Sequence, residues 1–130
     1  MKRDKEIYLN YVCPNCWFTL DRCTCDVFPP QHLIHIDNGI QEHIRILNNK
    51  GYYTMYCCEG HSAGSNTYIS FGSTYFQDTT TTPKGFKYDK KNNSISYFYS
   101  TKLSIEEVEK TKEEKLSSLL QWCKDLPDII

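Results

Sequence analysis

No stretch of this 130-residue sequence approaches the roughly 18 consecutive apolar residues that a membrane-spanning helix needs. The charged segment Met1 to Glu6 leads into no apolar run of signal-peptide length. Neither sign of charge dominates, because 15 Lys and Arg stand against 16 Asp and Glu, for a formal net charge of -1. We therefore expect a cytoplasmic protein with no membrane partner, and the charge balance disfavours nucleic acid as a partner.

Methionine is scarce at two residues, whereas tyrosine and phenylalanine are abundant at ten and six. A hydrophobic content of 39% with 24% charged residues is typical of a folded domain. The length suffices for one ordinary domain, or for a small core with an appendage. Because aromatic residues fit pleated, half-buried surfaces, this composition favours a β-rich sheet.

Closely spaced cysteines near the N-terminus suggest a metal site. Thiols stay reduced in the cytoplasm, so close cysteines there bind metals more often than they form disulfides. A Cys-x-x-Cys turn lets two thiolates face one ion, and a second cysteine pair completes a tetrahedral set. The sequence therefore predicts a four-thiolate structural zinc site without an open coordination position, formed by Cys13, Cys16, Cys23 and Cys25. The alternative is that some of these thiols fill a small core.

Pro29-Pro30 provides the best candidate for a boundary, because neither residue can donate a backbone hydrogen bond. It separates a zinc-ribbon-like knuckle unit, residues 1–30, from a main domain, residues 31–130. In the first unit, a short strand is predicted over residues 7–11, directly before the first two cysteines.

The main domain is predicted to be α+β, with a small antiparallel or mixed sheet and two helices packed on it. A helix over residues 38–50 has Asp37 or Asn38 as its cap, and His43 lies near its apolar stripe, where a buried histidine is more common than a ligand. A capping box at Ser104 opens a long helix whose buried stripe begins at Ile105. The predicted strands cover residues 33–36, 52–58, 67–72, 86–88 and 94–99.

The segment Cys57-Cys58-Glu59-Gly60-His61 concentrates reactive side chains at the end of a strand. Alternation places Met55 and Cys57 toward the core and directs Cys58 toward the loop over residues 59–66. Cys58 and His61 could be two ligands of one metal, a thiol activated by an imidazole, or a turn stabilised by side chains. The backbone amides of the loop could also hold an anionic group. A metal there needs a further ligand, for which the candidates are His32, His35 and Glu59.

Three motifs carry a family resemblance: Ile44-x-x-Leu47-Asn48-x-x-Gly51-Tyr52-x-Thr54-x-x-Cys57-Cys58-Glu59-Gly60-His61, then Tyr68-Ile69-x-Phe71, and near the end Trp122-x-x-x-x-Pro127. Through them residues 36–72 resemble a small uncharacterised family found in phages and Gram-positive bacteria. The resemblance to that family implies no particular activity for this chain. More remotely, Cys58-Glu59-Gly60 is similar to the Cys-Ser-Gly motif of the wybutosine-synthesising tRNA methyltransferase family, with His61 in place of its arginine. The resemblance indicates a fold rather than a reaction.

Two functions fit these patterns. The first is a zinc-stabilised binding protein of phage accessory type, which holds a small polar or nucleotide-like ligand or a host protein. Its expected binding residues are Tyr56, Cys58, Glu59, Gly60, His61 and Tyr68. The second is a thiol- or metal-dependent enzyme acting on a nucleotide or a modified RNA, with Cys58 and His61 as the catalytic candidates. The first is favoured, because no complete catalytic set can be written from the sequence.

Overall fold

The computed structural model describes residues 11–19, 22–25, 34–72 and 82–129. Within these residues it has two α-helices and two antiparallel sheets, which confirms the predicted α+β class. The smaller sheet pairs β1 (Tyr11–Val12) with β2 (Ile34–His35). The larger sheet has the strand order β3-β4-β6-β5, with bounds β3 (Thr54–Cys58), β4 (Asn66–Phe71), β5 (Lys87–Asp89) and β6 (Ser94–Phe98). The helices are the 3-10 turn η2 (Asn38–Ile40), α2 (Gln41–Asn49) and α3 (Ile105–Asp125).

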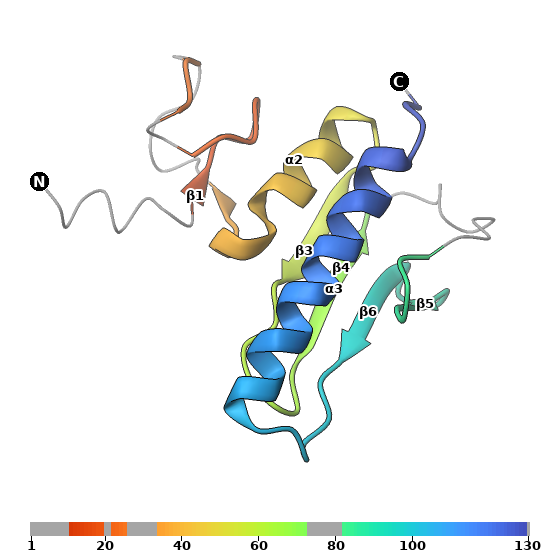
Figure 1. Ribbon diagram of the computed structural model, residues 1–130. Coiled ribbons are helices and arrows are strands. Elements are labelled where there is room, and N and C mark those ends of the chain that lie inside the picture. The colour runs from red at the N-terminus through yellow and green to blue at the C-terminus, as the bar shows by residue number, and fades with distance from the viewer. Residues whose placement is uncertain (1–10, 20–21, 26–33, 73–81, 130) are drawn as a thin grey trace, which may run out of the picture.

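Helices α2 and α3 cover the same face of the larger sheet, as Figure 1 shows. Alternation in β4 sends Thr67, Ile69 and Phe71 into the core beneath them, while Tyr68 and Ser70 face the other way. The other members of this core cluster come from the helices, β6, the cysteine unit and the connecting segments: Val12, Ile36, Ile40, Ile44, Leu47, Tyr52, Phe86, Ile95, Leu119 and Cys123. Because Val12 belongs to this cluster, the cysteine unit packs on the main core.

The predicted secondary structure is confirmed in most places where the structure describes it. The helix expected over residues 38–50 is η2 followed by α2, and the hairpin expected around residues 89–93 joins β5 to β6. His43 is buried at 4% exposure, and its Nε2–H donates to the Leu116 carbonyl at 2.7 Å. The predicted cap is wrong in one respect, because the Asp37 side chain makes no capping hydrogen bond.

A β-bulge overturns the predicted orientation of Met55. The register of β3 against β4 shifts between Thr54 and Tyr56, so that Tyr56 pairs with Ser70 and Cys57 with Ile69. An extra residue in one strand breaks alternation, and Met55 is consequently 62% exposed rather than buried. Beyond the bulge the prediction holds: Cys57 packs against the core and Cys58 faces the opposite side.

Helix α3 begins at the predicted capping box. The Ser104 side chain accepts from the Glu107 amide, and the Glu107 side chain accepts from the Ser104 amide. The expectation that Ile105 starts the buried stripe is wrong, because this side chain is 83% exposed. The first buried residue of the helix is Val108, one turn later, where the helix lies over the sheet.

The predicted strand over residues 7–11 reaches the described part of the chain only at Tyr11, in β1, and the boundary at Pro29-Pro30 lies outside the described residues. Among the residues that the structure describes, no helix combines the length and the apolar character that a membrane span requires.

Candidate functional site

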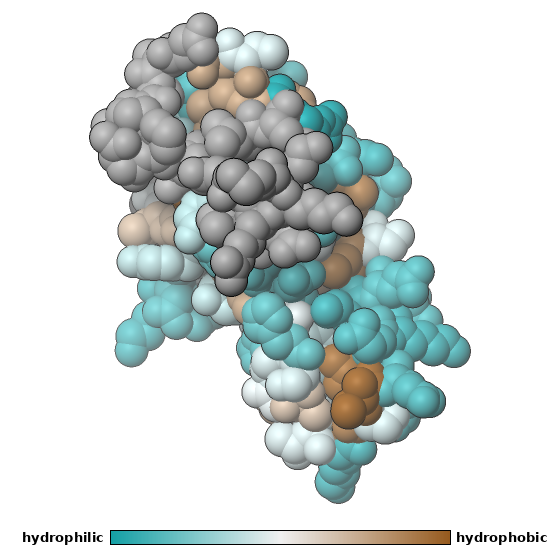
Figure 2. Space-filling view, turned by 90° about the vertical axis from the view of Figure 1, so that its left-hand side faces the viewer, coloured by the Kyte–Doolittle hydropathy of each residue, from teal (hydrophilic) through white to brown (hydrophobic). Residues whose placement is uncertain are grey.

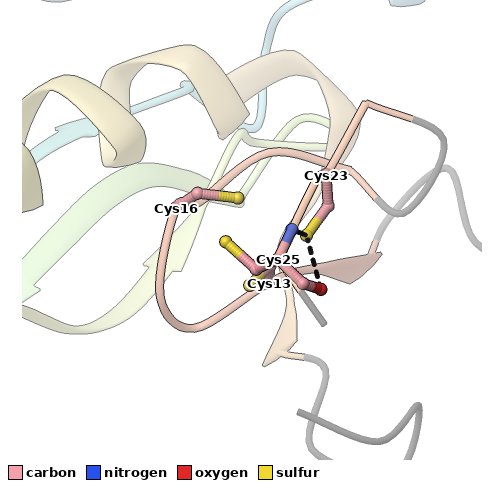
Figure 3. Close-up of side chains that lie close together, drawn as sticks. All are labelled: Cys13, Cys16, Cys23 and Cys25. Carbon is pink, nitrogen blue, oxygen red and sulfur yellow. Dashed lines mark hydrogen bonds between the residues drawn. The ribbon is translucent and has the colours of Figure 1, made fainter. Parts of the chain in front are cut away.

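The four N-terminal cysteines lie together in the structure. The sulfurs of Cys13, Cys16, Cys23 and Cys25 are all within 4.8 Å of one another, and Figure 3 shows them gathered between the turns that carry them. Cys13 directly follows β1, and the chain turns back so that Thr19 bridges to Val12. This hairpin brings the second cysteine pair beside the first, as the spacing predicted.

Backbone and amide N–H groups face the sulfurs of this cluster. The Asn15 amide donates to Cys13 Sγ at 3.4 Å, and the Cys25 amide donates to Cys23 Sγ at 3.3 Å. The Asn15 side chain also donates to Cys25 Sγ, at 3.2 Å. Such donors stabilise thiolates, which are the form of cysteine that binds metals.

The thiols of the cluster influence one another's pKa. Burial acts to raise the pKa of Cys13, but hydrogen bonds from the amides of Cys16 and Asn15 outweigh it and lower that pKa. The Cys25 amide acts to lower the pKa of Cys23, yet burial and the sulfurs of Cys13 and Cys16 prevail and raise it to about 12. Four thiolates cannot share this space without a cation, so the donor set and its crowding fit a metal ion.

The loop after β3 is held by α3, β4 and the segment after β6. Thr67 Oγ1 donates to the Glu59 carbonyl at 2.7 Å, and the Gly64 amide donates to the Tyr99 carbonyl at 2.7 Å. Lys112 of α3 donates to the Gly60 carbonyl at 3.4 Å. The small residues of this loop therefore allow a close approach of the backbone to its neighbours.

Asp37 joins Cys58 and His61 in a second cluster. One ligand atom from each of these residues lies within 4.8 Å of the other two. Asp37 Oδ2 is 3.4 Å from His61 Nε2 and accepts a hydrogen bond from the Glu59 amide at 3.3 Å. The Asp37 side chain is 20% exposed and the His61 side chain 60%, so the cluster lies at the surface.

Neither cysteine of the Cys57-Cys58 pair is an activated thiol in this arrangement. Burial raises the pKa of Cys57 to about 12. Burial also raises the pKa of Cys58, and the Asp37 carboxylate adds to this shift, although the Gly60 amide acts against it. A thiol with a raised pKa forms little thiolate at neutral pH and is a poor nucleophile.

Two of the predicted binding residues line a hollow beside the edge strand β3. This hollow of about 200 Å³ has an aromatic lining from Trp17, Tyr56 and Tyr68, together with Ile36 and Cys57 among others. Tyr68 pairs with Cys58 across the strands, and burial together with the charges of Cys58, Cys57 and Asp37 raises the pKa of its phenol. Tyr68 thus connects the hollow to the cluster of Asp37, Cys58 and His61.

His61 also lines a second hollow of about 200 Å³, which it shares with the exposed Ile105. On the face drawn in Figure 2, an apolar area lies among hydrophilic side chains at the lower end, where α3 begins in Figure 1. The outer side of the His61 loop is therefore partly apolar.

The sequence identified Cys58 and His61 but missed Asp37. Of the third ligands considered, His35 lies instead against the Tyr11 ring, and His32 is outside the described residues. Glu59 turns its carboxylate toward Gly39, where a side chain would collide with it. Asp37 lies 21 positions before Cys58 and had the pattern of a helix cap, so no signal of spacing linked it to the loop.

Comparisons of the chain with models of known protein families, with curated proteins and with solved structures found no match. The interpretation of the site therefore depends on its own residues.

Proposed function

We propose that this protein is a zinc-stabilised binding protein whose ligand is small and nucleotide-like. In this proposal the cluster of Cys13, Cys16, Cys23 and Cys25 holds one structural Zn²⁺ in a zinc-ribbon-like unit. Four thiolates satisfy the tetrahedral preference of Zn²⁺, so this ion leaves no position for a substrate. Its role is to hold the unit whose Val12 enters the core and whose Trp17 lines the aromatic hollow.

The position of Tyr68 is the observation that carries the binding proposal. Its side chain lines the aromatic hollow, and its strand position pairs with Cys58 of the second cluster. One ligand can therefore place a flat ring against Tyr56 and Tyr68 while its polar end reaches the loop of Glu59, Gly60 and His61. A nucleoside or nucleotide has this combination of an aromatic ring and a polar end, and bases stack on aromatic side chains. The hollow of about 200 Å³ is small for a whole ligand, so it suits the ring alone.

A role as a phage-type accessory protein, with a ligand taken from the host cell, is supported only by the family resemblance of residues 36–72. Binding of a host protein at the same loop is the corresponding alternative partner. The exposed apolar Ile105 beside His61 is the feature that supports it.

The binding proposal is tested with the 5′-monophosphates of adenosine, guanosine, cytidine and uridine, measured by calorimetry on the zinc-loaded chain. We expect at least one to bind. Tyr56→Ala or Tyr68→Ala should then weaken binding by about 5-fold to 150-fold, since stacking contributes about 1–3 kcal/mol per base. Tyr53→Ala is the matched control, because Tyr53 is 51% exposed and adjoins β3 but does not line the hollow.

Binding of none of the four nucleotides, or equal affinity in Tyr56→Ala and the unsubstituted chain, would overturn this proposal. The structural zinc has its own test by metal analysis of the purified protein. Cys13→Ser or Cys23→Ser should lower the zinc content by one equivalent per chain, and an unchanged content would exclude the cluster as the zinc site.

A second candidate function is a metal-dependent enzyme acting on a nucleotide or a modified RNA. The convergence of Asp37, Cys58 and His61 favours it, because carboxylate, thiolate and imidazole are all zinc ligands. Incubation of the zinc-loaded chain with the same four nucleotides, followed by mass spectrometry, tests it. A product that is absent with His61→Ala supports an enzyme, whereas unchanged nucleotides exclude these substrates.

A further inference from the structure

We infer that Asp37, Cys58 and His61 form a second metal site, which takes Zn²⁺ and leaves one coordination position open to a ligand. The inference deepens the proposed function, because the open position would bind the polar end of the same ligand at the loop of Glu59, Gly60 and His61. In this respect it rests on the proposed function. The metal itself requires only these three side chains.

The spacing of the three side chains suits a metal of this size. In a tetrahedral site with zinc bond lengths of about 2.0–2.3 Å, neighbouring ligand atoms are about 3.3–3.8 Å apart. His61 Nε2 and Asp37 Oδ2 are already 3.4 Å apart, and all three ligand atoms lie within 4.8 Å of one another. The His61 side chain is 60% exposed, so its rotation can bring the three ligand atoms to these distances without movement of the backbone.

The backbone around Cys58 repeats the arrangement found at the four-cysteine cluster. The Gly60 amide donates to Cys58 Sγ at 3.4 Å, two residues along the chain. The same donation from residue i+2 to the sulfur of residue i occurs from Asn15 to Cys13 at 3.4 Å and from Cys25 to Cys23 at 3.3 Å. Cys58 is thus presented in the same local turn as two cysteines of a four-thiol cluster. Metal-ligating groups are commonly oriented by hydrogen bonds of this kind.

The direction of the imidazole separates a metal site from a catalytic triad. In a triad, one ring nitrogen of histidine faces the nucleophile and the other faces the carboxylate. Here a single nitrogen of His61 lies within 4.8 Å of both the Asp37 oxygen and the Cys58 sulfur. Three ligand atoms from different parts of the chain therefore lie close enough together to reach one ion.

The charges of the donor set also suit a site that binds ligands. One thiolate, one carboxylate and a neutral imidazole balance the charge of a divalent cation. The four-thiolate cluster with the same ion carries a net charge of -2. Three protein ligands with a fourth position open are the composition of zinc sites that bind exogenous groups. An anionic oxygen, such as that of a phosphate, can occupy this position without opposing net charge.

The test is the zinc content of the full chain after equilibration with Zn²⁺ and removal of unbound metal, measured by mass spectrometry of the element. We expect two zinc ions per chain. Asp37→Asn and His61→Gln should each reduce this to one. The asparagine side chain keeps an oxygen that can accept from the Glu59 amide, so Asp37→Asn preserves the hydrogen bond. The matched controls are Glu109→Gln, an exposed carboxylate that lines the His61 hollow, and His35→Gln, an exposed histidine of β2; both should keep two ions.

Cobalt substitution supplies a second readout that does not depend on zinc stoichiometry. A Co²⁺ titration should show two phases, because thiolate-to-cobalt absorption is stronger for four thiolates than for one. Asp37→Asn should abolish the weaker phase and leave the stronger one, which also demonstrates that the variant is folded around its cysteine cluster.

One zinc ion in the unsubstituted chain, or two in both Asp37→Asn and His61→Gln, would overturn the second site. Failure of the second site is distinguishable from failure of the proposed function. Nucleotide binding with one zinc per chain refutes the second site alone. Two zinc ions without binding of any of the four nucleotides refute the nucleotide proposal and leave the metal site in place.

Discussion

Two glycines of the same loop provide a matched test of how tightly it is packed. Gly60 and Gly64 have nearly equal φ angles of 90° and 88°. A Cβ at Gly60 would lie 2.7 Å from Tyr99 Cε2 and 2.8 Å from Thr67 Oγ1, whereas a Cβ at Gly64 would meet Thr101 Cγ2 at 3.4 Å. Replacement of each glycine by alanine therefore imposes the same backbone strain but a different degree of overpacking.

The expected cost of each substitution is the sum of these two contributions. A left-handed backbone costs a non-glycine residue about 1–2 kcal/mol, and this is nearly the whole cost of Gly64→Ala. Overpacking of a closed site adds about 1–3 kcal/mol. Tyr99 and Thr67 are both 0% exposed, so neither can move aside easily. We expect Gly60→Ala to lower the free energy of unfolding by about 2–5 kcal/mol in total.

Urea denaturation of both variants with saturating zinc measures this difference, provided that the dependence of the unfolding free energy on urea is unchanged. The informative quantity is Gly60→Ala minus Gly64→Ala, which should be about 1–3 kcal/mol because the backbone contribution cancels. Equal destabilisation of the two variants would show that Gly60 is not packed against Tyr99 and Thr67. The close packing of this loop against β4 and the segment after β6 would then be wrong.

Three further substitutions test the contacts that support the site and the core. Thr67→Val leaves the Glu59 carbonyl without its donor, and should lower the unfolding free energy by about 1–3 kcal/mol in urea; a change below about 0.5 kcal/mol would contradict this. Lys50 donates to the carbonyls of Cys123, Lys124 and Leu126 at the end of α3. Lys50→Met should therefore lower the free energy of unfolding by about 2 kcal/mol, whereas the exposed control Lys124→Met should lower it by less than about 0.5 kcal/mol. Burial lowers the pKa of His43 from its ordinary 6.5, so the unfolded chain takes up a proton first as the pH falls through that value. The unfolding free energy should therefore fall below about pH 6.5, by up to about 1.4 kcal/mol per pH unit, and parallel urea-derived pH profiles for His43→Gln and the unsubstituted chain would refute this.

Most of the fold could be predicted because its signals are local. The capping box at Ser104 marks the start of α3 within one residue, and alternation places Ile69 and Phe71 on one face of β4, which the structure shows to be the buried face. The errors arise where tertiary structure overrides a local pattern. The bulge beside Met55 has no signature in the strand sequence, and Ile105 has the spacing of a buried stripe but lies in the first turn of the helix, before the core begins.

The candidate sites differ in the same way. Four cysteines within 13 residues form a site that spacing alone can reveal, because the ligands come from one hairpin. The second cluster requires the chain to bring Asp37 beside Cys58, and this contact depends on the packing of η2 against the loop. Tyr68 likewise gains its significance from its pairing with Cys58, which the sequence cannot specify without the strand register.

Two departures from local rules, one in the backbone and one in a helix cap, lie at the two clusters that contain cysteine. Trp17 follows Cys16 with φ of 64°, a left-handed conformation that is uncommon for a bulky side chain. Asp37 has the sequence position of a helix cap but turns its carboxylate to the Glu59 amide and His61, which leaves η2 without a side-chain cap. Each departure carries a cost in free energy that the surrounding structure must offset. In proteins whose local sequence preferences otherwise agree with the fold, such departures occur mainly at functional or strained positions. The Asp37 carboxylate instead accepts from the Glu59 amide and approaches His61, and these contacts offset the lost helix cap. We therefore attribute the second departure to the cluster of Asp37, Cys58 and His61, as we attribute the first to the four-cysteine cluster.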